Sequence, residues 1–169
     1  MSDSILGYVL GLIVIAILVF TGPIYQNFDT GDRLVDSIAQ DVVDKYDKDI
    51  CKSGYIDQKT YMNFLDDLSR TGEVYDIQMI HTSRLVFPSI TNSDDYEIHE
   101  VKYGRDVILN TIKDGTSKYT MRYGDDFKIE ITETSPAPSR LLSSIFSGKG
   151  IPPLLPFGKG GMVENEVVE

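Results

Sequence analysis

The chain has 169 residues, with 26 acidic and 16 basic side chains and a formal net charge of −10. Its 41% apolar and 10% aromatic content excludes a fully disordered chain, because such a chain lacks the residues that build a core. The acidic excess argues against a nucleic-acid binder, which needs surplus Lys and Arg to neutralise phosphates. The single cysteine, Cys51, excludes an internal disulfide and a thiolate zinc cage.

The N-terminal segment is apolar, and residues 4–28 carry no charge. From Ile5 to Tyr25 an α-helix would be roughly 30 Å long, which is enough to cross a hydrocarbon core. Its Leu, Ile, Val and Phe side chains supply on the order of 4–7 kcal/mol of insertion free energy. We therefore predict a transmembrane anchor over residues 1–25. The candidate anchor residues are Ile5, Leu6, Gly7, Val9, Leu10, Gly11, Leu12, Ile13, Val14, Ile15, Ile17, Leu18, Val19 and Phe20.

A cleaved secretory signal is the main alternative for this segment, and a buried core helix is a third. A signal needs a basic leader and a small-residue cleavage site, but the nearest basic residue is Arg33 and the chain reads Val19-Phe20-Thr21-Gly22. Gly7 and Gly11 would let a second membrane helix pack closely, although ordinary glycines explain them more simply. The short N-terminal tail and the acidic flank favour a cytoplasmic N-terminus and an extracytoplasmic domain.

Two more helices are predicted after the anchor. Thr21-Gly22-Pro23 predicts that the anchor ends or kinks there. An amphipathic helix then runs from about Asp29 to Cys51, and Ser53-Gly54 stops it. Asp57 as N-cap and Gly72 as terminator predict the next helix. The apolar stripe of the amphipathic helix comprises Leu34, Val35, Ile38, Val42, Val43, Tyr46 and Ile50.

In much of the remainder of residues 26–134, apolar and polar side chains alternate, which is typical of strands. The predicted elements are a strand at 75–81 with 84–87 continuing or following it, a polar loop at 91–95, a strand at 96–103, a short helix at 105–113, a strand at 118–122, a hairpin turn at Gly124-Asp125 and a strand at 127–134. This order predicts an α+β domain with a largely antiparallel sheet covered by the amphipathic helix. Residues 135–169 are rich in Pro and Gly and predict an irregular tail, interrupted by one apolar helical turn at Leu141–Phe146.

Local motifs for chemistry are weak. His81 and His99 fall in predicted strands, and a metal pair would need those strands to be neighbours, while zinc normally takes three or four ligands. Gly158-Lys-Gly-Gly161 lacks the spacing of a phosphate-binding loop. Cys51 has no motif that lowers its pKa. We therefore predict no enzyme, no cofactor and no metal site.

The helix-then-sheet plan resembles that of pilins and pseudopilins. More specifically, the chain resembles the minor pseudopilin-type (TadE/TadF-like) proteins of tight-adherence (Tad/Flp-type) pilus clusters in Gram-positive bacteria. The segments that carry this resemblance are Ser53-Gly-Tyr-Ile-Asp57, Thr71-Gly72, Tyr75-Asp-Ile77, Gly124-Asp-Asp-Phe127 and Gly160-Gly-Met-Val-Glu-Asn165. Each segment is short, and their order and spacing carry the likeness.

The resemblance implies a non-catalytic structural subunit of a Tad-like type IV pilus or a related secretion filament. Its expected partners are the lipid bilayer, other pilus or pseudopilin subunits and the assembly platform, in a hetero-oligomer without nucleic acid. Contacts to other subunits are expected through the amphipathic stripe, a sheet edge or the Leu141–Phe146 turn. The alternatives are a membrane-tethered extracytoplasmic ligand-binding or sensor domain, with a deep polar pocket, and a tethered hydrolase with a dispersed site.

Overall fold

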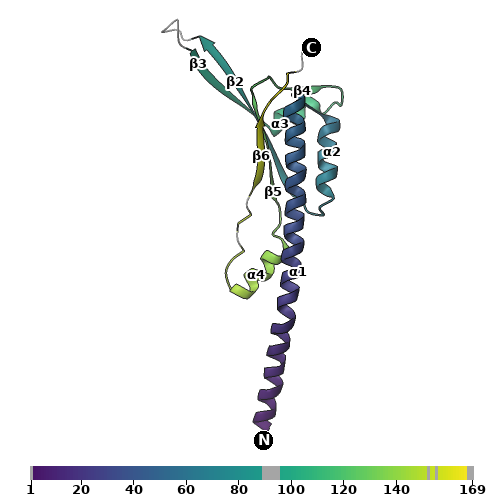
Figure 1. Ribbon diagram of the computed structural model, residues 1–169, viewed down its shortest axis with the longest axis vertical. Coiled ribbons are helices and arrows are strands. Elements are labelled where there is room, and N and C mark those ends of the chain that lie inside the picture. The colour runs from purple at the N-terminus through teal and green to yellow at the C-terminus, as the bar shows by residue number, and fades with distance from the viewer. Residues whose placement is uncertain (1, 89–95, 152, 155, 167–169) are drawn as a thin grey trace. The chain divides into compact units, whose positions relative to one another are not determined.

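Figure 1 shows the computed structural model of the chain, which describes residues 2–88, 96–151, 153–154 and 156–166. The predicted loop at 91–95 lies outside these residues, as do the side chains of Asp3 and Leu18. The chain forms two compact units. Residues 1–37 and 136–153 make up the first unit, and residues 38–135 and 154–169 make up the second. The predicted domain boundaries stay predictions.

One long helix, α1 (Ser2–Ser53), contributes to both units. The helix does not end at Thr21-Gly22-Pro23, because Pro23 lies inside α1, and the other predicted outcome, a kink at this segment, stays a prediction. Proline removes one backbone donor from a helix, but strong helical segments on both sides make a stop there unfavourable. The hydroxyl of Thr21 also donates to the carbonyl of Ile17, which returns a hydrogen bond to this stretch.

The end of α1 follows the prediction. Gly54 adopts a left-handed φ of 74°, and its N–H donates to the carbonyl of Ile50 at 2.9 Å. The C-terminal segment of the chain binds the next two carbonyls. The N–H of Glu164 donates to Cys51 at 2.8 Å, and the side-chain amide of Asn165 donates to Lys52 at 2.6 Å. Residues distant in sequence therefore satisfy acceptors that every helix end leaves open.

The shorter helices begin and end close to their predicted positions. In α2 (Gln58–Ser69) the Asp57 carboxylate accepts the N–H of Thr60 at 2.7 Å, which confirms the predicted N-cap. The predicted helix at 105–113 is α3 (Arg105–Ile112). The predicted apolar turn belongs to a longer helix, α4 (Pro138–Ser147), which starts with proline and ends at Gly148.

The strands form two antiparallel sheets. In the smaller sheet, β1 (Tyr55–Asp57) pairs with β4 (Lys118–Thr120). The larger sheet has the order β3-β2-β5-β6. Its strands are β2 (Tyr75–Pro88), β3 (Tyr96–Gly104), β5 (Asp126–Glu133) and β6 (Phe157–Met162). The predicted turn at Gly124-Asp125 is confirmed, since the N–H of Asp125 donates to the carbonyl of Arg122 at 3.1 Å, but it is not a hairpin, because β4 and β5 belong to different sheets. The irregular tail is also wrong where β6 pairs with β5.

The core of the second unit lies between the larger sheet and the helices. Ile77 and Met79 of β2 stand opposite Ile131 and Ile129 of β5, so these side chains share one face of the sheet. That face and the C-terminal half of α1 contribute to one hydrophobic cluster. The buried members from the helices are Ala39, Val43, Tyr46, Ile50, Cys51, Phe64, Leu68 and Ile108. The chain is therefore an α+β protein with a long N-terminal helix and antiparallel sheets.

Candidate functional site

The N-terminal half of α1 presents a continuous apolar surface. Ile5, Leu6, Val9, Leu10, Leu12, Ile13, Val14, Ile15, Ile17, Val19 and Phe20 are all exposed. Among the described residues, α1 is the one helix that is long and apolar enough to cross a membrane. A Cβ added at Gly7 or Gly11 would meet no atom within 4 Å, so the chain itself does not use the space at these glycines. Close packing of a second helix there stays a prediction.

The C-terminal half of α1 has the opposite surroundings. Val43 and Ile50 are fully buried, and Ala39 and Tyr46 join them in the core. The predicted apolar stripe is not buried along its whole length, because Leu34 and Ile38 are exposed. The stripe therefore packs in the protein's own core only from Ala39 onwards. One helix thus carries an exposed apolar surface in its first half and a buried apolar stripe in its second half.

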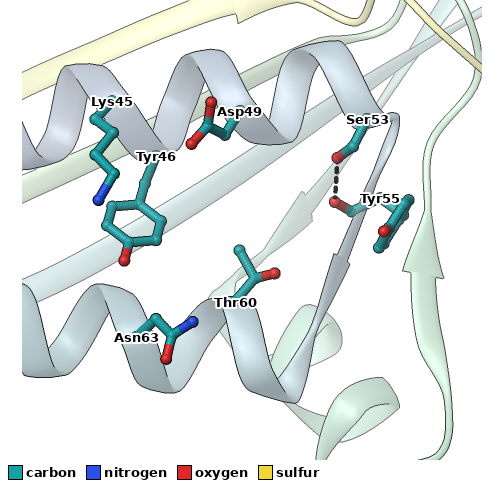
Figure 2. Close-up of a pocket in the computed structure, with 7 residues that line it drawn as sticks. All are labelled: Lys45, Tyr46, Asp49, Ser53, Tyr55, Thr60 and Asn63. Atoms are coloured by element: carbon teal, nitrogen blue, oxygen red, sulfur yellow. Dashed lines mark hydrogen bonds between the residues drawn. The ribbon is translucent and has the colours of Figure 1, made fainter.

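A polar cavity of about 350 Å³ opens between the C-terminal half of α1 and α2. Figure 2 shows Lys45 and Tyr46 of α1 facing Thr60 and Asn63 of α2 across it. At its end, the Ser53 hydroxyl donates to the carbonyl of Tyr55 at 3.0 Å. The volume is at the low end of those that bind small ligands. This cavity is the feature that a ligand-binding domain would use.

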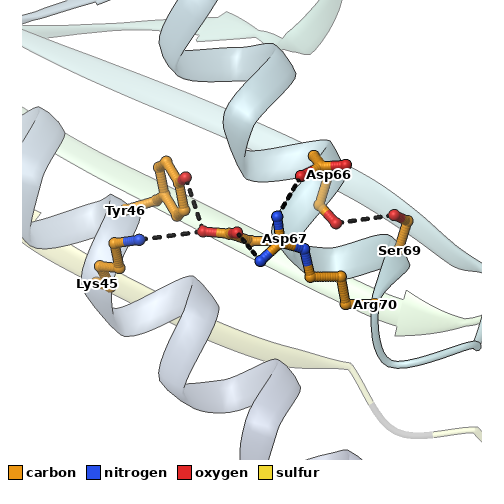
Figure 3. Close-up of polar contacts among 6 residues, drawn as sticks. All are labelled: Lys45, Tyr46, Asp66, Asp67, Ser69 and Arg70. Carbon is orange, nitrogen blue, oxygen red and sulfur yellow. Dashed lines mark hydrogen bonds and ion pairs between the residues drawn. The ribbon is translucent and has the colours of Figure 1, made fainter.

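Two polar groups beside this cavity already bind Asp67 of α2 (Figure 3). The Tyr46 hydroxyl and the Lys45 ammonium both donate to Asp67 Oδ2, at 2.9 and 3.0 Å. Arg70 lies 3.7 Å from the other carboxylate oxygen. The hydrogen bond from Lys45, followed by that from Tyr46, lowers the pKa of Asp67. Asp67 therefore ties α2 to α1, and it engages the hydroxyl proton of Tyr46 and one N–H of Lys45.

His81 lies in a buried hydrogen-bond network rather than in a metal site. Its Nε2 is 2.9 Å from Asp125 Oδ2, and its Nδ1 is 2.7 Å from the Tyr119 hydroxyl. Burial, followed by the neighbouring charges of Tyr103 and Asp125, raises the pKa of Tyr119 to about 12, so its hydroxyl keeps its proton beside Nδ1. The ionised carboxylate of Asp125 can only accept a hydrogen bond, so the Nε2–H of His81 donates to it.

Asp125 continues the sheet where the pairing of β2 with β5 ends. Its carboxylate accepts the backbone N–H of Arg84 at 3.2 Å and that of Arg122 at 3.0 Å. Burial raises the pKa of Asp125, but the hydrogen bonds from His81 and these two N–H groups outweigh it, so the pKa is lowered. Because β2–β5 pairing stops at Thr82, the side chain supplies the acceptor that β5 no longer provides.

The network pairs a histidine with a carboxylate, as a dispersed hydrolase site would. However, His81 is 4% exposed and Asp125 is 2% exposed, so both contact protein rather than solvent. His99 stands opposite Leu85 on the neighbouring strand and is exposed, so it does not meet His81. Within the described part of the chain, no group of three or more His, Cys, Asp or Glu side chains is placed to hold a metal ion. We assign the network a structural role.

A second buried carboxylate, Asp47, lies on α1 and is 2% exposed. Its Oδ1 has no hydrogen-bond partner among the described residues. Burial, followed by the negative charge of Asp44, raises the pKa of Asp47 to about 6, against the opposing charges of Lys159 and Lys48. Gly161 of β6 lies against this part of α1, where an added Cβ would be 3.3 Å from Cys51 Sγ and 3.6 Å from Asp47 Oδ2.

Cys51 lies beside Asp47 and is also buried. Burial and then the charge of Asp47 raise the pKa of its thiol to about 12, which agrees with an unreactive structural cysteine. Our sequence reasoning missed the buried position of Asp47, although a signal was present. Asp47 follows Val43 by four residues and precedes Cys51 by four, so it falls on the apolar stripe.

Comparison with protein-family models, with curated proteins and with solved structures finds no match to this chain. We therefore infer the function from the structure of the chain itself. The feature with the clearest physical consequence is the exposed apolar surface of α1.

Proposed function

We propose that the chain is a membrane-anchored structural subunit, of the minor pilin or pseudopilin kind, in a Tad-like type IV pilus or a related secretion filament. In this proposal the first 25 residues span the cell membrane once. The N-terminus is cytoplasmic and the second unit is extracytoplasmic. Other subunits and the assembly platform are its partners, in a hetero-oligomer that needs no catalytic site or cofactor.

The observation that carries the proposal is the change of surroundings along α1. An apolar helix surface exposed to water is unfavourable by about 25 cal/mol per Å², so a run such as Leu6 to Phe20 needs lipid or other helices around it. The same helix continues without interruption to Ser53, where its apolar stripe is buried. A subunit built in this way connects a membrane segment directly to a folded domain, which is the plan of a pilin-like protein.

A second feature supports contacts with other subunits. Beyond Thr82, β2 pairs only with β3, so the outer part of these strands is a two-stranded ribbon. The ribbon exposes Val86, Phe87, Tyr96 and Ile98. A two-stranded ribbon with exposed apolar side chains is marginal in water, and β3 has a free edge. The ribbon is therefore the subunit contact that we favour over the amphipathic stripe, much of which packs in the core.

The test uses a strain in which this chain is the sole copy of the subunit, with filaments counted by electron microscopy. Deletion of residues 1–25 should abolish filaments. Ile98→Arg should also reduce them, because it places a charge on the exposed ribbon. Met62→Arg is the matched control, since Met62 is an exposed apolar residue of α2 away from the ribbon strands. Normal filaments in the deletion strain, or equal effects of the two arginine variants, would contradict the proposal.

The alternative, a membrane-tethered ligand-binding or sensor domain, is favoured by the cavity in Figure 2. Asn63→Trp places a large ring into that cavity from the exposed side of α2. If the chain acts as a structural subunit, this variant should assemble normally. Loss of function with intact folding and normal membrane insertion would favour the ligand-binding alternative.

A further inference from the structure

Helix α4 packs in the first unit with its polar side toward α1. Its first turn is held by α1, because the Asp32 carboxylate accepts the N–H of Ser139 at 2.8 Å. The guanidinium of Arg140 lies 3.9 Å from the carboxylate of Asp36. The carboxylate of Asp32 thus caps the positive end of α4, a favourable arrangement for a negative charge.

The apolar side of α4 is exposed as a result. Leu141, Leu142, Ile145 and Phe146 are spaced as one stripe on a helix, whereas Ser139, Ser143 and Ser147 lie on the other side. Ile145 is 72% exposed, Phe146 and Leu141 are exposed as well, and Leu142 is half-buried. The buried residue of this helix is Ser139, so most of the apolar stripe lies outside, which is opposite to the arrangement that water favours.

The place where α4 packs along α1 indicates which environment surrounds the apolar stripe of α4. Phe146 and Ser147 line a cavity of about 470 Å³ together with Thr21, Gly22 and Tyr25 of α1. These α1 residues are the end of the uncharged segment that we propose to span the membrane. The C-terminal end of α4 therefore lies beside α1 where α1 leaves the hydrocarbon core, and Figure 1 shows α4 next to α1.

The charged residues near α4 in the sequence also favour a position at the membrane surface. Residues 136–153, which belong to the first unit together with α4, contain Arg140 and Lys149 but no Asp or Glu, although the whole chain has 26 acidic residues. Amphipathic helices that lie in the membrane interface combine an apolar stripe with basic flanks, because lipid headgroups are often anionic.

We propose that α4 is an interfacial membrane helix, whose stripe of Leu141, Leu142, Ile145 and Phe146 inserts between lipids beside the exit of α1. The inference rests on the proposed membrane-spanning role of α1. It adds a second lipid contact, which limits the tilt and rotation of α1 at the membrane surface. The ligand is the lipid surface itself.

The test uses the absence of tryptophan from the chain, so that each variant carries one fluorescent reporter. The full chain is reconstituted in phosphatidylcholine–phosphatidylglycerol vesicles that contain lipids brominated either deep in the acyl chains or near the headgroups. Ile145→Trp reports on the stripe and Val14→Trp on the spanning segment. Leu34→Trp is the control, because Leu34 is 62% exposed in the same unit and lies roughly 14 Å beyond Tyr25 on α1.

Deep bromines should quench Val14→Trp most, and shallow bromines should quench Ile145→Trp several-fold more than Leu34→Trp. If Val14→Trp is quenched but Ile145→Trp behaves like Leu34→Trp, the interfacial role of α4 is wrong and the anchor stands. A blue-shifted Ile145→Trp emission that bromolipids do not quench would assign the stripe to a protein partner and overturn the inference. If Val14→Trp is not quenched either, the anchor and the inference both fail.

Discussion

The buried carboxylate of Asp47 makes the stability of the second unit depend on pH. Its pKa is about 6 in the folded chain, against an ordinary value of 3.8. A raised carboxylate pKa means that the fold favours the protonated form. The unfavourable contribution of Asp47 is therefore absent below about pH 4, develops as the pH rises, and is complete above the folded pKa.

The size of the effect follows from the two pKa values. A difference of about 2 units corresponds to about 3 kcal/mol over the whole titration. Roughly 1 kcal/mol of this falls between pH 5 and pH 8, because much of the titration lies below pH 5. Asp47→Asn removes the charge at similar shape. Its stability relative to the native chain should therefore rise by about 1 kcal/mol between these two pH values.

Urea unfolding of the full chain in detergent micelles measures this difference, with the ten tyrosines followed by near-ultraviolet circular dichroism. Comparison of the variant and the native chain at each pH cancels the contributions of the other carboxylates. Asp49→Asn is the matched control for the loss of one carboxylate charge, because Asp49 lies on the same helix but is exposed. If Asp47→Asn changes the free energy of unfolding by the same amount at both pH values, the reasoning is refuted.

Three further substitutions test the packing of the second unit in the same unfolding assay. Gly54→Ala should cost several kcal/mol, because the residue has a left-handed φ and the new Cβ would collide with the carbonyl oxygen of Asn165. Gly72→Ala shares the left-handed φ in open space and should cost only about 1 kcal/mol; similar losses for the pair would argue against the close approach at Gly54. Asp125→Ala should cost at least about 3 kcal/mol at neutral pH, because it leaves a buried histidine and two N–H groups without an acceptor. Since the pKa of Asp125 is lowered by the fold, this loss should shrink as the pH falls below about 4, and a loss independent of pH would count against an ionised carboxylate.

Helices and strands whose apolar residues are regularly spaced were predictable from the sequence. The helix capped by Asp57 and the alternating strands that became β2 and β5 were placed within a few residues. In each, the apolar spacing that defines the element also determines the face that it buries, so local pattern and tertiary packing agree. The exposed apolar surface of α1 was predictable for a simpler reason, because composition alone defines it.

Features that depend on distant residues were not predictable in this way. β6 contains three glycines and no apolar alternation, and it forms a strand because β5 offers a partner. At Gly160 a Cβ would lie 3.1 Å from the backbone carbonyl oxygen of Phe127 and 3.2 Å from Lys128 Cβ, so the strand favours glycine for a reason that only its neighbour reveals. Asp125 has the sequence signature of a turn residue, but His81 and two backbone N–H groups from elsewhere in the chain make it a buried acceptor.

The central claim is that the first 25 residues hold the chain in a membrane. Extraction of isolated membranes with alkaline carbonate tests it most directly, because this treatment releases proteins that are not inserted in lipid. The native chain should remain in the membrane pellet, and the chain without residues 1–25 should be recovered folded in the supernatant. Recovery of the native chain in the aqueous fraction without detergent would contradict the claim.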